Sequence, residues 1–150
     1  MERVDILSES KASQSHLKKV DTLFLIDDDS IYQFLTKKVI EETKIIDQIK
    51  IFSNGLEAIQ FLDSVKDIPS KLPDIILLDL TMPVMDGWEF LEEYILLKPK
   101  FNKKITLYIV SSSIAPSDIE KAKSISTVTD FVVKPITKEK LIAIIKNLNI

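Results

Sequence analysis

Polar side chains that could carry out phosphoryl chemistry stand directly after the short apolar runs of this sequence. They comprise three carboxylates, one hydroxyl and one amine: Asp27, Asp28, Asp79, Ser111 and Lys134. Clustered carboxylates offer the hard oxygen ligands that Mg²⁺ prefers, usually together with a phosphate group. An aspartate can also act as a nucleophile and form an aspartyl phosphate. A metal ion, a lysine and a hydroxyl would then stabilise the charge on the transferring oxygens.

Asp79 alone does not decide between two interpretations. It ends the apolar run Ile75–Leu78, and a carboxylate there is either a solvated strand terminus or a reactive group. Pro83 and the Asp86-Gly87 turn follow, and a helical pattern resumes at Trp88. The elements that position the other polar residues must therefore settle the matter.

Short apolar runs alternate with amphipathic stretches along the whole chain. The runs predict strands at 23–26, 49–52, 75–78, 105–110 and 130–133. The stretches predict helices from about 30, 55, 87, 116 and 137, the third of them ending near Leu97. This alternation is typical of an α/β fold, a doubly wound five-stranded parallel sheet with five helices. In such a sheet the five polar residues share the carboxyl edge, where ligands bind.

The apolar spacing also predicts which helix faces are buried. In the first helix the predicted buried face consists of Ile31, Phe34, Leu35, Val39 and Ile40, and in the third of Phe90, Leu91, Tyr94 and Ile95. Asp29 or Ser30 is suited to cap the first helix. Three adjacent aspartates repel one another, so a compensating cation is expected nearby.

Composition bounds the class of protein. The chain has 150 residues, a net charge of −3, no cysteine, and 45% hydrophobic residues. It suits one domain and excludes disulfides and thiolate metal sites. The acidic balance argues against direct nucleic-acid binding. Neither a run of about 18 apolar residues nor a secretory signal is present, so no membrane association and a cytoplasmic location are expected.

The amino-terminal stretch differs in composition from the rest. It is rich in serine and scattered charges, and it predicts a flexible leader over residues 1–20 before a domain at 21–150. His16, the only histidine, falls in this leader and is interpreted as a solvated surface residue.

Over about residues 22–149 the chain resembles the receiver domain of bacterial two-component response regulators, which has the flavodoxin-like fold. Four motifs carry the resemblance: FLIDDD at 24–29, LLDLTMPVMDG at 77–87, IVSS at 109–112 and FVVKP at 131–135. The resemblance implies that Asp79 accepts a phosphoryl group from a sensor histidine kinase or a phosphotransfer protein. It also implies that Asp27, Asp28, Asp79 and the backbone carbonyl of Thr81 hold Mg²⁺.

The same resemblance implies roles for the remaining residues of the motifs. Lys134 would pair with the phosphoryl group, and the Lys134–Pro135 bond would be a cis peptide. Ser111 stands at the switch hydroxyl position. Phe131 stands at the switch aromatic position, where tyrosine is frequent in the family, and unlike tyrosine it has no hydroxyl. Asp29 would serve as a cap, and Thr81 and Ser113 match positions that tune loss of the phosphoryl group.

The resemblance further implies a switch in a partner-binding surface. Phosphorylation would move Ser111, let Phe131 turn inward and reshape the surface at about 115–149, which would bind a downstream protein. Since the sequence ends near the last helix, a stand-alone receiver acting by docking is expected, with phosphorylation-dependent homodimerisation left open. It would not be an enzyme beyond assisting its own phosphorylation and dephosphorylation.

Two alternatives come from different classes. Asp27, Asp29 and Ser30 resemble the Asp-x-Asp start of a haloacid-dehalogenase-type phosphatase, but that family needs an acidic pair after the lysine and only Glu139 is present. It also leaves Asp79 without a role. A degenerate receiver that only binds proteins is the other alternative, although such domains typically lose the acceptor or the lysine.

Overall fold

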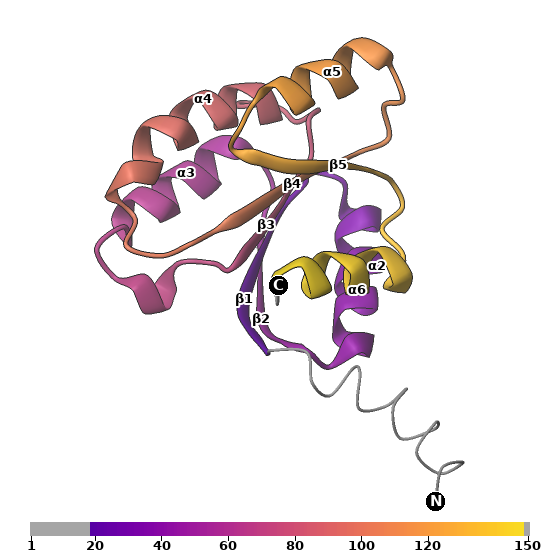
Figure 1. Ribbon diagram of the computed structural model, residues 1–150, viewed down its shortest axis with the longest axis horizontal. Helices are drawn as coiled ribbons and strands as arrows, with labels where there is room; N and C mark the ends of the chain where they lie inside the picture. The colour runs from indigo at the N-terminus through magenta and orange to yellow at the C-terminus, as the bar shows by residue number, and fades with distance from the viewer. Residues whose placement is uncertain (1–18, 149–150) are drawn as a thin grey trace, which may run out of the picture.

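A computed structural model describes residues 19–148 and contains one sheet of five parallel strands (Figure 1). The strands are β1 (Val20–Ile26), β2 (Ile46–Phe52), β3 (Ile75–Leu78), β4 (Thr106–Ser111) and β5 (Val128–Val133). Their order is β2-β1-β3-β4-β5, with every neighbouring pair parallel. The predicted doubly wound sheet is confirmed. Strands β1, β2 and β5 begin two or three residues earlier than predicted, because their first residues are partly polar.

Between and after the strands, residues 19–148 form five α-helices and two 3-10 turns. The helices are α2 (Ser30–Thr43), α3 (Gly55–Ser64), α4 (Gly87–Leu97), α5 (Pro116–Ser124) and α6 (Lys138–Leu148), and the turns are η1 (Pro69–Lys71) and η2 (Lys98–Lys100). Helices α2 and α6 cover one face of the sheet, and α3, α4 and α5 cover the other (Figure 1). Within residues 19–148 no helix is both long and apolar enough to cross a membrane.

The two helical layers explain the continuous apolar runs. All four residues of β3 are buried, because successive side chains point to opposite faces and each face is covered by helices. Ile76 and Leu78 belong to the core beneath α3, α4 and α5, whereas Ile75 and Leu77 belong to the core beneath α2 and α6. Strand β3 is central, and its register pairs Leu77 with Leu25 of β1 and with Tyr108 of β4.

The predicted buried face of α2 is wrong in its first half. Ile31, Phe34 and Leu35 are 66%, 64% and 47% exposed, whereas Thr36 and Ile40 are buried. The apolar residues of this helix fall on two faces, and the buried one passes through positions 32, 36 and 40, which are four residues apart. Asp29 caps the helix as predicted, because its side chain accepts hydrogen bonds from the backbone of residues 31 and 32.

Helix α4 has the predicted bounds and nearly the predicted core face. Phe90, Leu91 and Tyr94 are buried, but Ile95 is 42% exposed, and the buried Leu97 takes its place. Asp86 and Glu89 form a capping box, in which each side chain accepts a hydrogen bond from the other's backbone N–H. The start of α4 is therefore fixed directly after the loop that follows β3.

The predicted leader cannot be compared with the structure in full. Residues 1–18, including His16, lie outside the described residues, and Val20 already belongs to β1. The division of the chain at residues 20 and 21 stays a prediction.

Gly87 lets α4 start against the end of β3. Its N–H donates a hydrogen bond to the carbonyl of Leu80 at 2.9 Å. A Cβ atom at residue 87 would collide with the carbonyl oxygen of Asp79 and lie 2.8 Å from the Cα of Leu80. Both obstacles are backbone, which cannot move away without shifting Asp79.

We expect Gly87→Ala to destabilise the fold by about 3 kcal/mol, the upper end of the usual range for overpacking. Urea unfolding followed by circular dichroism measures this change. Glu92→Ala, an exposed substitution on the same helix, should alter the unfolding free energy by less than about 0.5 kcal/mol. Equal stability of the Gly87→Ala variant and the wild type would contradict the steric argument.

Candidate functional site

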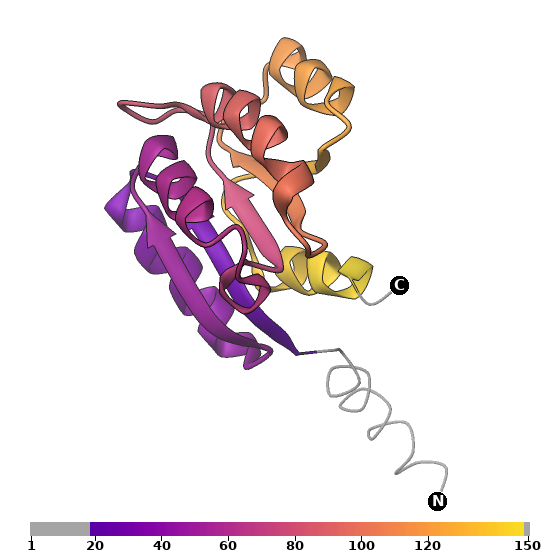
Figure 2. The same ribbon diagram turned by 90° about the vertical axis from the view of Figure 1, so that its left-hand side faces the viewer.

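The carboxyl ends of β1 and β3 bring three carboxylates together. The strands run toward one end of the molecule (Figure 2), and Asp27, Asp28 and Asp79 each offer an oxygen within 4.8 Å of the others. Asp27 and Asp79 are 3% and 7% exposed, whereas Asp28 is open to solvent. The strand order reverses between β1 and β3, the switch point at which open α/β sheets bind ligands.

Lys134 supplies the cation that the sequence leads one to expect. It follows β5, and its Nζ lies 2.8 Å from Oδ2 of Asp27 and 3.6 Å from Oδ1 of Asp79. Burial lowers the pKa of Lys134, but the hydrogen bond and charge of Asp27, with those of Asp79, outweigh burial and raise the pKa. The lysine therefore stays protonated at the site. The Lys134–Pro135 peptide bond is cis.

The first turn of α2 fixes the position of Asp27. The backbone N–H of Asp29 donates to Oδ1 of Asp27 at 2.9 Å, and the side-chain amide of Gln33 donates to its carbonyl oxygen at 2.6 Å. With Lys134 on Oδ2, both carboxylate oxygens of Asp27 are bound. Gln33 was not predicted from the sequence, since a glutamine inside an amphipathic helix carries no distinctive signal.

Asp79 occupies an electrostatically unfavourable position. Burial, followed by repulsion from Asp27, raises its pKa to about 6, although Lys134 and the hydrogen bond from the N–H of Leu80 act in the opposite direction. Its charged form is therefore less stable here than in water. At neutral pH most molecules still carry the carboxylate, which can act as a nucleophile without a general base.

The remaining predicted site residues lie on the neighbouring strands. Ser111 ends β4 and is buried, and its Oγ accepts a hydrogen bond from the N–H of Ser113. Phe131 of β5 is partly buried against the core beneath α3, α4 and α5. The Oγ of Ser113 donates to Asp118 of α5 at 2.7 Å. Thr81 is exposed in the loop after β3.

Tyr32 is a neighbour of the site that sequence reasoning missed. The Nζ of Lys134 lies 4.2 Å from the centroid of its ring. The residue belongs to the buried face of α2, four residues before Thr36, and is itself partly buried. The sequence would have indicated Tyr32 only if the buried face of α2 had been predicted correctly. The Asp29 cap helps to set which face that is.

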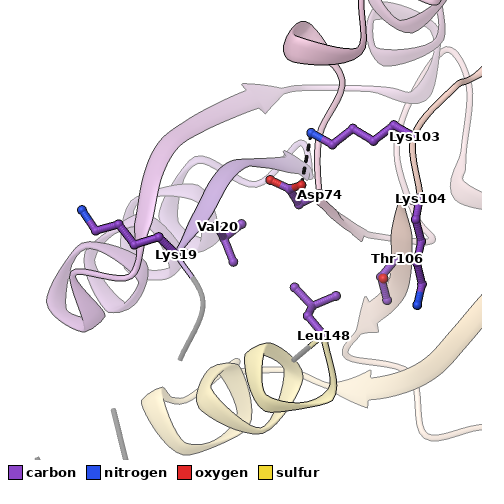
Figure 3. Close-up of a pocket in the computed structure, with 7 residues that line it drawn as sticks. All are labelled: Lys19, Val20, Asp74, Lys103, Lys104, Thr106 and Leu148. Atoms are coloured by element: carbon purple, nitrogen blue, oxygen red, sulfur yellow. Dashed lines mark ion pairs between the residues drawn. The ribbon is translucent and has the colours of Figure 1, made fainter. Parts of the chain in front are cut away.

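A separate pocket of about 280 Å³ lies at the opposite, amino-terminal edge of the sheet (Figure 3). Its Asp74 pairs with Lys103 at 3.1 Å and accepts hydrogen bonds from the backbone N–H groups of Asp21 and Thr22. Lys103 also donates to the carbonyl of Leu72. These groups tie the start of β1 to the segments before β3 and β4, so they serve the fold and not the carboxylate site.

The doubly wound parallel sheet, with an acidic site and a lysine at its carboxyl edge, defines the class of CheY-like receiver domains. The profile of the response regulator receiver domain matches residues 23–146, and the chain belongs to this family. It is therefore a signalling domain of two-component systems, and the phosphatase alternative is set aside. The similarity covers every strand except the first three residues of β1.

Similar proteins include a sensor histidine kinase, a chemotaxis protein and a response regulator of known structure. The sensor histidine kinase CheAY of Helicobacter pylori is 30% identical over 94% of this chain, which spans only 17% of that protein. The chemotaxis protein CheY of Listeria monocytogenes is 28% identical over 80% of this chain and 91% of its own length. A two-component response regulator from Cytophaga hutchinsonii has a TM-score of 0.80 and 32% identity, covering 88% of this chain and 98% of that one.

We expect Asp79→Asn to stabilise the metal-free protein at pH 7. A pKa raised from 3.8 to about 6 means that the folded state binds more protons than the unfolded state between these values, so stability falls as pH rises through this window. Above it the ionised Asp79 costs about 2–3 kcal/mol, which the neutral amide removes.

Thermal unfolding in EDTA from pH 7 down to pH 4 measures this effect. The gain of the Asp79→Asn variant should be largest at pH 7 and should shrink as pH falls toward 4. Asp63→Asn, at an exposed carboxylate of α3, should show little change at any pH. An Asp79→Asn variant no more stable than the wild type at pH 7 would contradict the proposed electrostatic cost.

Proposed function

We propose that this chain is a response regulator receiver in which Asp79 accepts a phosphoryl group from a phosphohistidine donor. The single observation that carries the proposal is the placement of Lys134, whose ammonium lies 2.8 Å from Asp27 and 3.6 Å from Asp79 at the carboxyl edge of the sheet. A degenerate receiver that only binds proteins would not need this buried cation beside an intact acceptor. We further propose that the receiver begins with β1 at Val20, one residue before the predicted boundary, and that the residues before it form a leader.

The proposed reaction is a direct transfer between donor and carboxylate. An oxygen of Asp79 forms a bond to phosphorus while the phosphorus–nitrogen bond of the donor breaks, and the electron pair of that bond stays on the imidazole. Lys134 would pair with a phosphoryl oxygen and offset the negative charge that arrives. Ser111, at the end of the adjacent strand, would donate a hydrogen bond from its hydroxyl to another phosphoryl oxygen.

The donor set fits Mg²⁺. Three carboxylate oxygens lie within 4.8 Å of one another, and one of the acids, Asp28, is exposed and open to an ion. Asp27, Asp28 and Asp79 would hold the ion, and we assign a fourth ligand to the backbone carbonyl of Thr81. When bound, Mg²⁺ would neutralise charge on the carboxylates and on the phosphoryl group.

The proposed switch runs from Ser111 to α5 and β5. Movement of Ser111 toward the phosphoryl group would break its hydrogen bond with Ser113, whose hydroxyl is bonded to Asp118 of α5. Phe131, only partly buried, would turn inward. The surface at about 115–149 would change shape and bind a downstream protein or a second copy of the chain, with phosphorylation biasing an existing two-state equilibrium.

Intact-mass spectrometry after incubation with acetyl phosphate tests the acceptor. We expect one phosphoryl adduct that requires Mg²⁺, is prevented by EDTA and is absent from Asp79→Asn. Asp63→Asn, which alters an exposed carboxylate of α3, serves as the matched control and should be labelled like the wild type. An adduct that persists in Asp79→Asn, or an unmodified wild type, would refute Asp79 as the acceptor.

An exposed apolar strip beside the site suits the docking of the donor protein. Ile31, Phe34 and Leu35 are all exposed on the first turns of α2, which begins directly after the acidic end of β1. Several large apolar side chains on one short stretch indicate a protein contact. We propose that the histidine-bearing helices of the kinase or phosphotransfer protein pack against this strip.

Phe34→Asp should slow transfer from a phosphohistidine protein that labels the wild type by about tenfold, the loss typical of an interface anchor. Acetyl phosphate needs no such contact, so the ratio of the two rates is the measurement. Ile68→Asp, an exposed apolar residue preceding η1, is the matched control and should leave the ratio unchanged. An unchanged ratio in Phe34→Asp would exclude the strip as the docking site.

A further inference from the structure

We propose that Tyr32 is a positioning residue for Lys134 and holds its ammonium in the orientation that phosphoryl transfer to Asp79 requires. This inference rests on the proposed function and adds a residue to it. The observation behind it is the ring of Tyr32, whose centroid lies 4.2 Å from Nζ of Lys134.

Three groups of the protein contact the ammonium of Lys134. Asp27 takes the shortest contact at 2.8 Å, Asp79 lies at 3.6 Å, and the ring of Tyr32 occupies a third direction. An ammonium has three N–H groups, and three groups of the protein lie around this one. The side chain of Lys134 is 7% exposed, which leaves little room for water to replace the ring.

Tyr32 is itself held by the group that fixes Asp27. The carboxylate of Asp29 accepts a hydrogen bond from the N–H of Tyr32 at 3.2 Å, and the N–H of Asp29 donates to Asp27. One turn of helix thus positions both the carboxylate and the aromatic ring that contact Lys134. Lys134 follows β5, far along the chain from α2, and its ammonium contacts both the Asp27 carboxylate and the Tyr32 ring.

The face of an aromatic ring attracts a cation but accepts no proton and forms no short ion pair. A ring can therefore restrain the ammonium without competing for the charge that the phosphoryl oxygens need. A carboxylate in the same place would bind Lys134 more strongly and would repel the phosphoryl group. We assign this effect to the ring and not to the hydroxyl of Tyr32, because Nζ lies over the ring.

The initial rate of Asp79 labelling by acetyl phosphate with Mg²⁺ tests the proposal in three variants. Tyr32→Phe keeps the ring and should label within about twofold of the wild type. Tyr32→Leu removes it and should be slower by about three- to tenfold, the range expected for a partly desolvated cation–π contact. Phe61→Leu removes a similar contact on α3, where Nζ of Lys50 lies 4.5 Å from the ring, and should label like the wild type.

A spectroscopic measurement separates positioning from general damage. Protons near Nζ of Lys134 lie over the ring of Tyr32, so their NMR signals should be shifted upfield in the wild type and in Tyr32→Phe but not in Tyr32→Leu. Recovery of both rate and shift in Tyr32→Phe supports the proposal. A Tyr32→Leu variant as fast as the wild type, or a Tyr32→Phe variant as slow as Tyr32→Leu, overturns it. An unlabelled wild type would instead refute the proposed function.

Discussion

The ion pair between Lys134 and Asp27 is the interaction on which the site depends. Both side chains are at most 7% exposed, and they join the end of the last strand to the end of the first. Removing the lysine would leave two buried carboxylates and a third beside them without a compensating charge, a situation that is strongly destabilising. The cation therefore permits the acids to be close together, and this closeness is what the proposed binding of a divalent ion and a phosphoryl group requires.

The same arrangement carries an electrostatic cost at Asp79. Burial and Asp27 raise the pKa of Asp79 to about 6, so the fold keeps a carboxylate where it is less stable than in water. The backbone of the β3–α4 connection holds that position, since Gly87 packs directly against Asp79 and Leu80. Stability is given up locally at Asp79, the proposed nucleophile, which is ionised at neutral pH and lies near groups that would bind the incoming charge.

The sheet and the polar residues at its edge could be predicted from the sequence because the apolar part of each strand is followed by a polar residue at the carboxyl end. The rotation of α2 about its axis could not. Its apolar residues, Ile31, Phe34 and Leu35 among them, satisfy helical spacing on a face that turns out to be exposed. The contact between Tyr32 and Lys134 depends on that rotation and joins residues about a hundred positions apart, so neither periodicity nor motif spacing contains it.

The central sheet separates two surfaces that proteins could recognise. The exposed strip of α2 lies on the layer shared with α6, whereas α5 lies with α3 and α4 on the opposite layer (Figure 1). A protein bound to the strip would leave α5 uncovered, so the proposed phosphoryl donor and the proposed target need not compete for one surface. The two layers meet in the loops around Asp79, Ser111 and Lys134. These loops are therefore the route by which a protein bound to one layer can affect the other.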